Sequence, residues 1–474
     1  MANFFKAKTI KPAQTATKEL LTITIEKLDL NGCGVAYYKK KPVFVNGSLP
    51  QEKVDIRLIE QKNKYARGKL LTVNNPSKSR VLAKCQHFSL CGGCDLQHLD
   101  YEEQLNFKQN KVIELFSRSG IAANTIEQLL WQAPITSSQW HYRRKARIGV
   151  QFDKNAKAII GFRQKATNQL VAVKSCPVLV EPAADIFPLL TALIDQLSVK
   201  KAIGHIEVLY ADSACQDLAN AAPDKSSKAL VLVVRQIRAI NEHDRNIWQK
   251  YANKNHWQVY FQEDNQSEQE NSSKNAANSL SYSLVDNLKI NFSSNDFVQI
   301  NQQVNVAMVE QALSWLTLET NDQVLDLFCG LGNFSLPLAN KVSQVVGVEG
   351  VQSMVDKACA NASFNHIDNC RFFQADLNTQ WLANKESNQW SNNPFTKVLL
   401  DPARAGAELA VEQIVKMAIP TILYVSCEPT TLARDSQLLL SQGYKIEKIG
   451  LIDMFSQTKH VETMVLFKRL HSQK

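Results

Sequence analysis

Short apolar runs separated by turn residues open the chain. Between residues 20 and 73 they read LLTITIEKL, GVAYYKK, KPVFVNG, EKVDIRLIEQ and ARGKLLTV, with Asn31-Gly32 and Asn46-Gly47 at turns between them. Runs of this length bounded by such turns predict β-strands. Five short strands within about 55 residues fit a small barrel of the oligonucleotide-binding type, which we place at residues 12–75.

The middle of the chain, residues 81–290, mixes helical and extended patterns. The run YEEQLNFKQNKVIELFSRSG has helical spacing of its apolar residues and stops at Gly120, whereas ALVLVVRQI at 229–237 is typical of a buried strand. Polar stretches at 216–228 and 263–279 contain too few apolar residues to pack, so they predict loops. We therefore expect a central α+β domain.

From about residue 295 onward, apolar strands alternate with helical segments. The strands read QVLDLFC, QVVGVE, KVLLDPAR, TILYVSC and ETMVLFKRL. This alternation predicts a parallel sheet with crossover helices, and hence an α/β Rossmann-like domain over residues 291–474. The polar stretch NKESNQWSNNP at 384–394 predicts a surface loop inside that domain.

Length and composition fit a multidomain globular protein. The chain has 474 residues, which at roughly 100–200 residues per domain suggests three domains. Apolar residues make up 45% and charged residues 21%, close to the average for globular chains. No run of about 18 apolar residues occurs, and the first residues, MANFFKAKTIKPAQTATK, lack the apolar stretch of a secretory signal. We expect a cytoplasmic protein with no membrane partner.

Positive charge is concentrated at one end of the chain. The net charge is +9, and residues 1–80 hold 16 Lys and Arg against 6 Asp and Glu, whereas the other 394 residues hold 38 against 39. An excess confined to the predicted barrel favours a module that binds a polyanion, the alternative being a basic surface kept for solubility. The strand pattern resembles the TRAM domain, an RNA-binding barrel attached to several RNA-modifying enzymes. The patch HYRRKAR at 141–147 is either a second RNA contact or one exposed strand face.

Four of the ten cysteines are candidate metal ligands. Cys85, Cys91 and Cys94 have the spacing C-x5-C-x2-C, and the two glycines between the last pair let the backbone fold tightly around one centre. Cys176 is the best candidate for a fourth ligand, because it precedes a proline and Cys-Pro commonly ends cluster-binding runs. Spacing alone leaves zinc and an iron–sulfur cluster both open.

A strand runs into a glycine turn at residues 324–333, VLDLFCGLGN. Ser335 stands where a dinucleotide-binding motif would have its third glycine. Glu349 ends the next strand, 23 residues after Asp326, a spacing that suits a carboxylate accepting hydrogen bonds from ribose hydroxyls. Asp376 ends the following strand, where it could accept a hydrogen bond from an adenine amino group. A D-x-F-x-G-x-G turn with two further strand-end acids resembles S-adenosylmethionine-dependent methyltransferases more than NAD enzymes.

Two later strand ends carry candidate reaction residues, DPARAG from Asp401 and VSCEP around Cys427. A cysteine at the carboxyl end of a parallel strand points into the crevice where ligands bind. Cys427 is therefore a candidate nucleophile rather than core filling.

Together these segments resemble the RNA uracil-C5 methyltransferase family. Its motifs D-x-F-C-G-x-G, D-P-P-R-x-G, S-C-N-P and H-x-E-x-x correspond here to DLFCGLG, DPARAG, SCEP and HVETM. Ala403 replaces the second proline and Glu428 replaces the asparagine, whereas Asp401, Arg404 and Cys427 are retained. The two departures concern the fine geometry of the loops rather than the chemistry.

The resemblance implies cofactors, ligands and a substrate class. It implies S-adenosyl-L-methionine as methyl donor, with contacts from Gln299, Phe328, Asn333, Glu349, Asp376 and Asp401. It also implies that the cysteines bind a [4Fe-4S] cluster, with the ligands Cys85, Cys91, Cys94 and Cys176. Barrel, cluster and methyltransferase domain together resemble the branch of the family that acts on 23S rRNA, for which we expect no obligatory protein partner.

The chemistry of uracil sets the remaining requirements, because its C5 is a poor carbon nucleophile. A Cys427 thiolate adding to C6 creates an enolate whose C5 can take the methyl group, after which a base must remove the C5 proton. Glu462 matches the base in H-x-E, and an antiparallel final strand would deliver it to the carboxyl edge of the parallel strands. The alternatives are that Glu462 pairs with Lys459 or Arg404, or that His460 is the base.

Three other functions are weighed against this one. They are the same reaction on tRNA or another rRNA site, a non-catalytic RNA-binding protein, and a tRNA methylthiotransferase, which also joins a TRAM barrel to a cluster. The cysteine spacing of a methylthiotransferase is absent, and the intact Cys427 with its strand-end acids argues against a non-catalytic protein.

Overall fold

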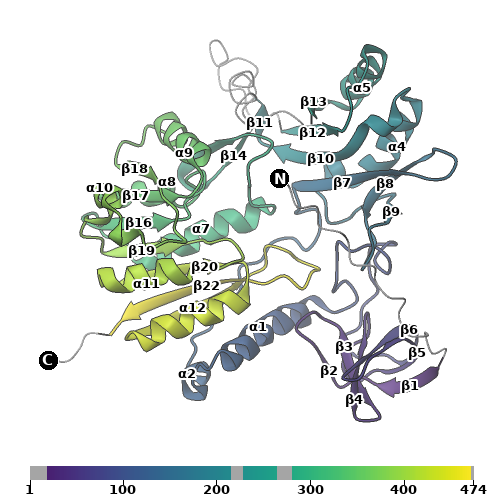
Figure 1. Ribbon diagram of the computed structural model, residues 1–474, viewed down its shortest axis with the longest axis horizontal. Coiled ribbons are helices and arrows are strands. Elements are labelled where there is room, and N and C mark those ends of the chain that lie inside the picture. Colours follow the sequence, from purple (N-terminus) through teal and green to yellow (C-terminus); the bar gives the residue numbers. More distant parts are fainter. Residues whose placement is uncertain (1–18, 215–227, 264–279, 471–474) are drawn as a thin grey trace, which may run out of the picture. The chain divides into compact units, whose positions relative to one another are not determined.

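The computed structural model describes residues 19–214, 228–263 and 280–470 (Figure 1). The predicted polar loops at 216–228 and 263–279 lie outside these residues except at one end each, as does the beginning of the predicted barrel. By its internal contacts the chain divides into two compact units. The first contains the described residues up to 89 together with 93–106 and 457–459, and the second contains 90–92, 107–456 and 460–470. The three-domain boundaries expected from the sequence remain a prediction.

The first unit is built on one six-stranded sheet. Its strands are β1 (Leu20–Thr24), β2 (Lys27–Leu28), β3 (Gly34–Tyr38), β4 (Lys41–Val45), β5 (Lys53–Gln61) and β6 (Ala66–Asn75). They follow the order β1-β5-β6-β4-β3-β2, with β4 parallel to β6 and the other neighbours antiparallel. Alternate side chains turn inward and form one apolar core, which includes Val43, Val54 and Ile56.

The first predicted strand, LLTITIEKL, contributes both edges of this sheet. The main-chain N–H of Ile25 donates to Glu52 at 2.9 Å and that of Glu26 donates to Val35 at 2.8 Å, so the chain leaves β5 and joins β3. Since β1 and β2 follow one another in sequence yet stand at opposite ends of the strand order, the sheet must curl back on itself. The six strands therefore form the small barrel that the sequence predicts with five.

The second unit contains a six-stranded mixed sheet with the order β13-β12-β10-β7-β8-β9. Its strands are β7 (Lys145–Phe152), β8 (Ala158–Arg163), β9 (Leu170–Ala172), β10 (Ile203–Ala211), β12 (Ala229–Gln236) and β13 (Trp257–Glu263). Helices α4 (Ile186–Gln196) and α5 (Glu242–Asn255) pack against it through Phe187, Leu190 and Trp248. The apolar strand expected at 229–237 is β12, and its residues are almost all buried.

Smaller elements surround this sheet. They are α1 (Tyr101–Arg118), α2 (Ala123–Glu127), α3 (Glu181–Ala184), η1 (Lys200–Ala202), β11 (Ser213–Ala214), β14 (Leu280–Ser283), η2 (Val285–Asn287) and β15 (Lys289–Phe292). Strands β11, β14 and β15 form a separate three-stranded sheet. Helix α1 ends two residues before Gly120, whose φ of 90° only glycine adopts readily, as the glycine stop in the sequence predicts.

The second unit also contains a seven-stranded sheet with the order β18-β17-β16-β19-β20-β22-β21 (green to yellow in Figure 1). Its strands are β16 (Gln323–Leu327), β17 (Gln344–Glu349), β18 (Cys370–Gln374), β19 (Lys397–Leu400), β20 (Thr421–Ser426), β21 (Tyr444–Ile452) and β22 (Glu462–Arg469). The first five are parallel, and β22 runs antiparallel between β20 and β21. The central strands are buried on both faces, as expected for a parallel sheet, so the Rossmann-like prediction is confirmed.

Helices connect these strands. They are α7 (Gln302–Leu316), α8 (Ser335–Ala339), α9 (Gln352–Phe364), η3 (Trp381–Ala383), η4 (Lys385–Ser387), α10 (Asn388–Ser391), α11 (Glu408–Met417) and α12 (Pro429–Ser441). None of the described helices is long and apolar enough to cross a membrane.

The surface loop expected at 384–394 is wrong in part. Two short helical turns, η4 and α10, occupy the segment, and Trp390 is only 2% exposed. Its ring lies 4.8 Å from that of Trp381, which is also buried. One tryptophan among polar neighbours is enough to anchor the segment, because a large aromatic side chain buries much apolar area.

Candidate active site

The glycine turn after β16 is held in an unusual backbone conformation. Phe328, Gly330 and Gly332 all have positive φ, at 64°, 55° and 92°. The first is rare for a residue with a bulky side chain, and such strain is typical of ligand sites. Asp326 is fully buried below the turn and accepts a 2.5 Å hydrogen bond from the Ser335 hydroxyl. Burial raises the pKa of Asp326 to about 7, and the nearby charges of Asp401 and Glu349 act in the same direction.

The strand-end acids reach one edge of the sheet, as the sequence predicts. Glu349 ends β17, and its carboxylate accepts hydrogen bonds from Gly330 at 3.2 Å and Val351 at 3.1 Å. The hydrogen bond from Gly330 ties Glu349 to the glycine turn of the neighbouring strand. Asp376 follows β18, where the main-chain N–H of Ala375 donates to Glu349, and its own carboxylate accepts from Asn378 at 2.9 Å. The three consecutive strand ends thus form a continuous polar rim.

Asn333 and Gln299 are two further residues that the sequence analysis predicts as cofactor contacts. The amide of Asn333 exchanges two 3.0 Å hydrogen bonds with the amide of Asn305 in α7, and its oxygen accepts a third from the Tyr282 hydroxyl. The main-chain oxygen of Gln299 accepts from Arg144 Nε at 2.8 Å. The positions of both residues are therefore set by side chains that are remote in sequence.

Cys427 and Glu462 are brought together by two antiparallel strands. Cys427 follows β20, Glu462 begins β22, and the residues beside them, Ser426 and Thr463, are partners in the register of the two strands. Asp401 follows β19, the other neighbour of β20. The nucleophile, the base and the acid of the Asp-Pro segment predicted from the sequence thus meet at one edge of the sheet.

Burial sets the protonation of this group. Burial, together with the charges of Glu462 and Asp401, raises the pKa of the Cys427 thiol to about 11, and the charge of Arg404 opposes this shift. Burial also raises the pKa of Asp401 to about 7. Glu462 is 5% exposed and its Oε2 atom has no hydrogen-bond partner among the described residues. Burial and the charge of Asp401 raise the pKa of Glu462 to about 8, within the range of a general base.

A buried ion pair that the sequence analysis did not predict influences the pKa of Glu462. The ammonium group of Lys108 in α1 donates to Asp453 at 2.5 Å and to the main-chain oxygen of Phe455 at 3.1 Å. The side chains of this pair are 2% and 1% exposed. The positive charge of Lys108 lowers the pKa of Glu462, opposing the effect of burial. No local motif marks this pair, because its members are 345 residues apart.

The described contacts bear on two of the alternatives for Glu462. Among the described residues Glu462 forms no ion pair with Arg404. His460 is exposed, and its ring lies 5.5 Å from that of Phe455. The buried carboxylate beside Cys427 is therefore the better placed acceptor of a proton.

Comparisons with known proteins identify the family of the chain. A family model described as tRNA (Uracil-5-)-methyltransferase matches residues 238–470, and a TRAM domain model matches residues 16–71. The chain is 57% identical to "23S rRNA (uracil(1939)-C(5))-methyltransferase RlmD" of Colwellia psychrerythraea, over 98% of this chain and 99% of the relative. The chain belongs to the RNA uracil-C5 methyltransferase family. A protein of the same description from Aliivibrio fischeri is 42% identical, over 99% of this chain and all of the relative.

A solved structure of the family supports the fold across most of the chain. The tRNA (uracil-54, C5)-methyltransferase of Pyrococcus abyssi, in complex with S-adenosyl-L-homocysteine, superposes with a TM-score of 0.69. The alignment covers 94% of this chain and all of that one, at 21% sequence identity.

The departures from the family motifs are accommodated. Glu428, in place of asparagine, is the N-cap of α12, where its side chain accepts a hydrogen bond from the main-chain N–H of Thr430 at 3.2 Å. This satisfies an N–H group in the first turn of the helix, as asparagine commonly does. The Asp-Pro loop is fastened by Asp435, which accepts from the Ala407 N–H at 2.8 Å and from the Tyr424 hydroxyl at 2.7 Å. Nothing described in the structure explains Ala403.

The four cysteines that the family resemblance makes cluster ligands are divided between the two units. Cys85 and Cys94 belong to the first unit, and Cys91 and Cys176 to the second. All four are half-buried thiols rather than disulfides. Across the part of the chain that the structure describes, no three cysteine, histidine or acidic side chains gather closely enough to hold a metal ion.

The basic patch HYRRKAR is mostly an internal structure rather than an exposed strand face. The Arg143 guanidinium donates to the main-chain oxygen of Lys145, and the Lys145 ammonium group donates to Ser294 and Asp296. Arg144 is 4% exposed. Only Arg147 of the four basic side chains is exposed. The periodicity of a strand explains this, since alternate residues of a half-buried strand face the core.

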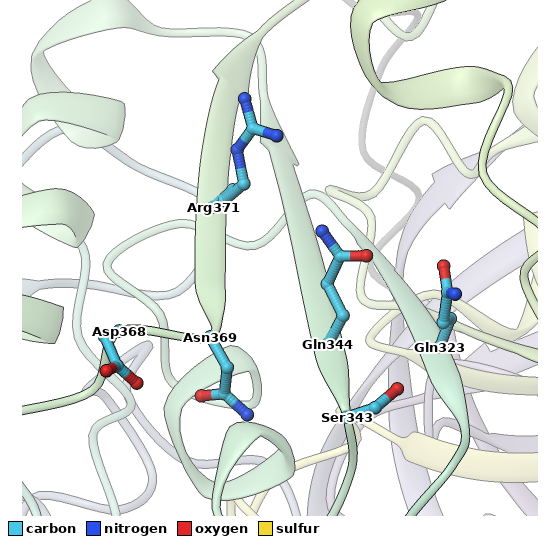
Figure 2. Close-up of a pocket in the computed structure, with 6 residues that line it drawn as sticks. All are labelled: Gln323, Ser343, Gln344, Asp368, Asn369 and Arg371. Carbon is cyan, nitrogen blue, oxygen red and sulfur yellow. The ribbon is translucent and has the colours of Figure 1, made fainter.

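A surface hollow of about 320 Å³ is lined by none of the candidate active-site residues (Figure 2). It is lined by Gln323, Ser343, Gln344, Asp368, Asn369 and Arg371, at the amino ends of β16, β17 and β18. The Asn369 amide donates to the main-chain oxygens of Ala339 and Val342, so it serves the fold. Ligands of doubly wound sheets bind at the opposite, carboxyl edge, so the hollow is not the active site.

Proposed function

We propose that this protein methylates C5 of a specific uridine in 23S rRNA, with S-adenosyl-L-methionine as the methyl donor. The observation that carries the proposal is the meeting of Cys427 and Glu462 at the carboxyl edge of the sheet. Relatives named as 23S rRNA uracil-C5 methyltransferases, matched over essentially their full length, support the RNA class.

Cys427 would add to uracil C6, which makes C5 electron-rich. Bound S-adenosylmethionine would supply the electrophilic methyl group for C5, with S-adenosylhomocysteine as the leaving group. Glu462 would then accept the C5 proton, and the electron pair released expels the Cys427 thiolate and restores the C5–C6 double bond. Asp401 and Arg404 are placed on the Asp-Pro loop to hold the uracil edge and orient the ring. The uridine must leave its stack to reach these groups.

Burial and the neighbouring acids disfavour the Cys427 thiolate in the free protein. With a pKa of about 11, the Cys427 thiol is protonated at neutral pH in the free protein. Glu462 and Asp401 both disfavour a thiolate, and Arg404 is the cation that favours it.

The methyl donor would lie along the polar rim. Glu349 is suited to the ribose hydroxyls and Asp376 to the adenine amino group, because a carboxylate accepts from both. Gln299, Phe328, Asn333 and Asp401 would complete the contacts. The positive φ of Phe328 and the two glycines lets the backbone of the turn approach the ligand closely.

We also propose a [4Fe-4S] cluster with the ligands Cys85, Cys91, Cys94 and Cys176. The donor set fits the group, because four thiols are the ligands such a cluster requires. The Gly92 N–H donates to Arg163 at 2.9 Å, and a Cβ there would lie 3.1 Å from that oxygen, which keeps the turn after Cys91 tight. When bound, the cluster would cross-link distant parts of the chain.

Anaerobically purified protein is expected to be brown and to contain about four irons per chain. The C91S variant should lose iron and melt at a lower temperature, whereas C359S, at an exposed position on α9, should keep both. One zinc per chain and no iron would contradict the proposal.

The barrel would bind the RNA, and action on ribosomal RNA places the protein in the cytoplasm. The basic excess over residues 1–80 supports RNA binding by the barrel, since phosphate contacts dominate RNA affinity.

A uridine in tRNA is the second candidate substrate, because the family model and the structural neighbour carry that description.

Mass mapping of methylated nucleotides tests the function. Ribosomal RNA from a strain that lacks the protein should miss one 5-methyluridine in 23S rRNA, and the wild-type chain or C359S should restore it. C427S should not. Loss of a methyl group from tRNA instead would move the substrate to the second candidate.

A further inference from the structure

Arg144 presents an unsatisfied cation inside the second unit. It directly precedes β7, and its side chain is 4% exposed. Its Nε donates to the main-chain oxygen of Gln299 at 2.8 Å, but the two terminal nitrogens, Nη1 and Nη2, are buried and have no hydrogen-bond partner among the described residues. Buried guanidinium nitrogens are costly to leave unpaired, so this pair of donors indicates a bound acceptor.

The surroundings place the guanidinium next to the cofactor contacts. Its carbon lies 4.5 Å from the centre of the Tyr282 ring, and the Tyr282 hydroxyl donates to Asn333 at 3.0 Å. Arg144 therefore touches Gln299 directly and reaches Asn333 through one ring. Asp212 is the acid whose charge acts on Arg144, but its Oδ2 accepts from the Ser283 N–H and from Gln302.

The charges of the proposed cofactor site require such a group. Gln299, Phe328 and Asn333 are neutral, and Glu349, Asp376 and Asp401 are acids. These six residues suit the hydroxyls, the amines and the sulfonium of S-adenosylmethionine. None of them is a cation that could pair with its one anionic group, the α-carboxylate of the methionine part. The two terminal nitrogens of an arginine match a carboxylate in a two-point hydrogen-bonded pair.

We infer that Arg144 binds the α-carboxylate of S-adenosylmethionine. The inference rests on the proposed function and adds a residue to its cofactor site. An RNA phosphate is the other anion present in the reaction. Phosphates are usually met by exposed basic residues, and Arg147 in the same segment is exposed, so the buried position of Arg144 favours the smaller ligand.

Calorimetric binding of two ligands tests this. The ligands are S-adenosylmethionine and its decarboxylated form, which lacks only the carboxylate. The wild-type protein is expected to bind the complete molecule roughly 10- to 100-fold more tightly, the range of a charged two-point hydrogen bond. R144Q should lose that factor for S-adenosylmethionine and bind the decarboxylated form within about twofold of wild type. R144K should keep part of the discrimination, and R147Q should keep all of it.

Several results would overturn the inference. They are equal wild-type affinity for both ligands, an equal loss for both in R144Q, or a loss of RNA affinity and salt dependence in R144Q with S-adenosylmethionine binding unchanged. The last would assign the anion to an RNA phosphate. If R144Q fails to fold, the wild-type comparison and R144K decide. A wild-type chain that binds neither ligand would instead contradict the proposed function.

Discussion

Ser426 and Thr463 are paired across β20 and β22, and this one register position makes Cys427 and Glu462 neighbours. Cys427 and Glu462 are 35 positions apart in sequence, and the strands β20 and β22 beside them run in opposite directions. Were β22 parallel to β20, Glu462 would stand at the far edge of the sheet. The reversal of the last strand is thus what brings Glu462 beside Cys427.

The first prediction distinguishes the roles of Cys427 and Glu462 by the reaction step at which a variant of each residue stops. C427S should neither form a covalent bond to RNA nor transfer methyl. E462Q should still allow addition and methylation but block proton loss, so a methylated protein–RNA adduct should accumulate. Denaturing electrophoresis with a methyl-labelled donor detects the adduct. Near wild-type turnover by E462Q, without an adduct, would remove Glu462 from the mechanism.

Glu462 should also make the folded protein less stable as pH rises. Its pKa is about 8 in the folded state and near 4.5 when exposed, so folding favours the protonated form. Stability from that proton is complete below pH 4.5 and is lost as pH rises through 8. E462Q, which is always neutral, should therefore be more stable than wild type by a few kcal/mol at pH 8.5 and about equal at pH 4.5. Urea unfolding at both pH values measures this, and a difference independent of pH would contradict it.

The buried pair of Lys108 and Asp453 should contribute strongly to stability. K108M removes the cation that pairs with the buried Asp453 carboxylate and should cost roughly 3–5 kcal/mol. R118A breaks an exposed pair with Glu114 on the same helix, α1, and should cost under about 1 kcal/mol. Urea unfolding of both variants gives the comparison, and equal losses would show that burial of the pair does not matter.

Loss of Lys108 should also be visible in catalysis. Because its charge lowers the pKa of Glu462, K108M should move the rising limb of the pH–rate profile to higher pH. Single-turnover methylation between pH 6 and 10 measures the shift. The double variant with D453N removes both charges and should return the profile toward that of wild type.

The barrel carries like charges that only a polyanion would favour. Arg57 and Lys69 are both exposed and stand directly opposite one another on β5 and β6, an arrangement that costs stability. The double variant R57Q/K69Q should fold at least as stably and bind RNA more weakly. The slope of log affinity against log salt should fall by roughly 0.7 for each lost phosphate contact. K254Q, at an exposed position on α5, should leave the slope unchanged.

Several features of this protein follow from the local spacing of residues along the chain. The glycine turn at 328–332 needs positive φ, and Glu349, Asp376 and Asp401 mark successive strand ends, so both could be identified from neighbouring residues alone. The same holds for the apolar strands of the seven-stranded sheet, because burial on both faces leaves continuous hydrophobic runs.

Other features depend on contacts between residues that are distant in sequence, and these are visible only in the folded protein. Lys108 and Arg144 look like ordinary surface cations in sequence, yet one is buried against Asp453 and the other beneath Tyr282. The apolar run LLTITIEKL is divided after Ile25 because the N–H of Glu26 donates to Val35 in β3, and Trp390 anchors a polar stretch through its own burial. In each case the environment of a side chain is set by the elements packed around it. That environment determines the burial, charge and pKa from which the chemistry follows.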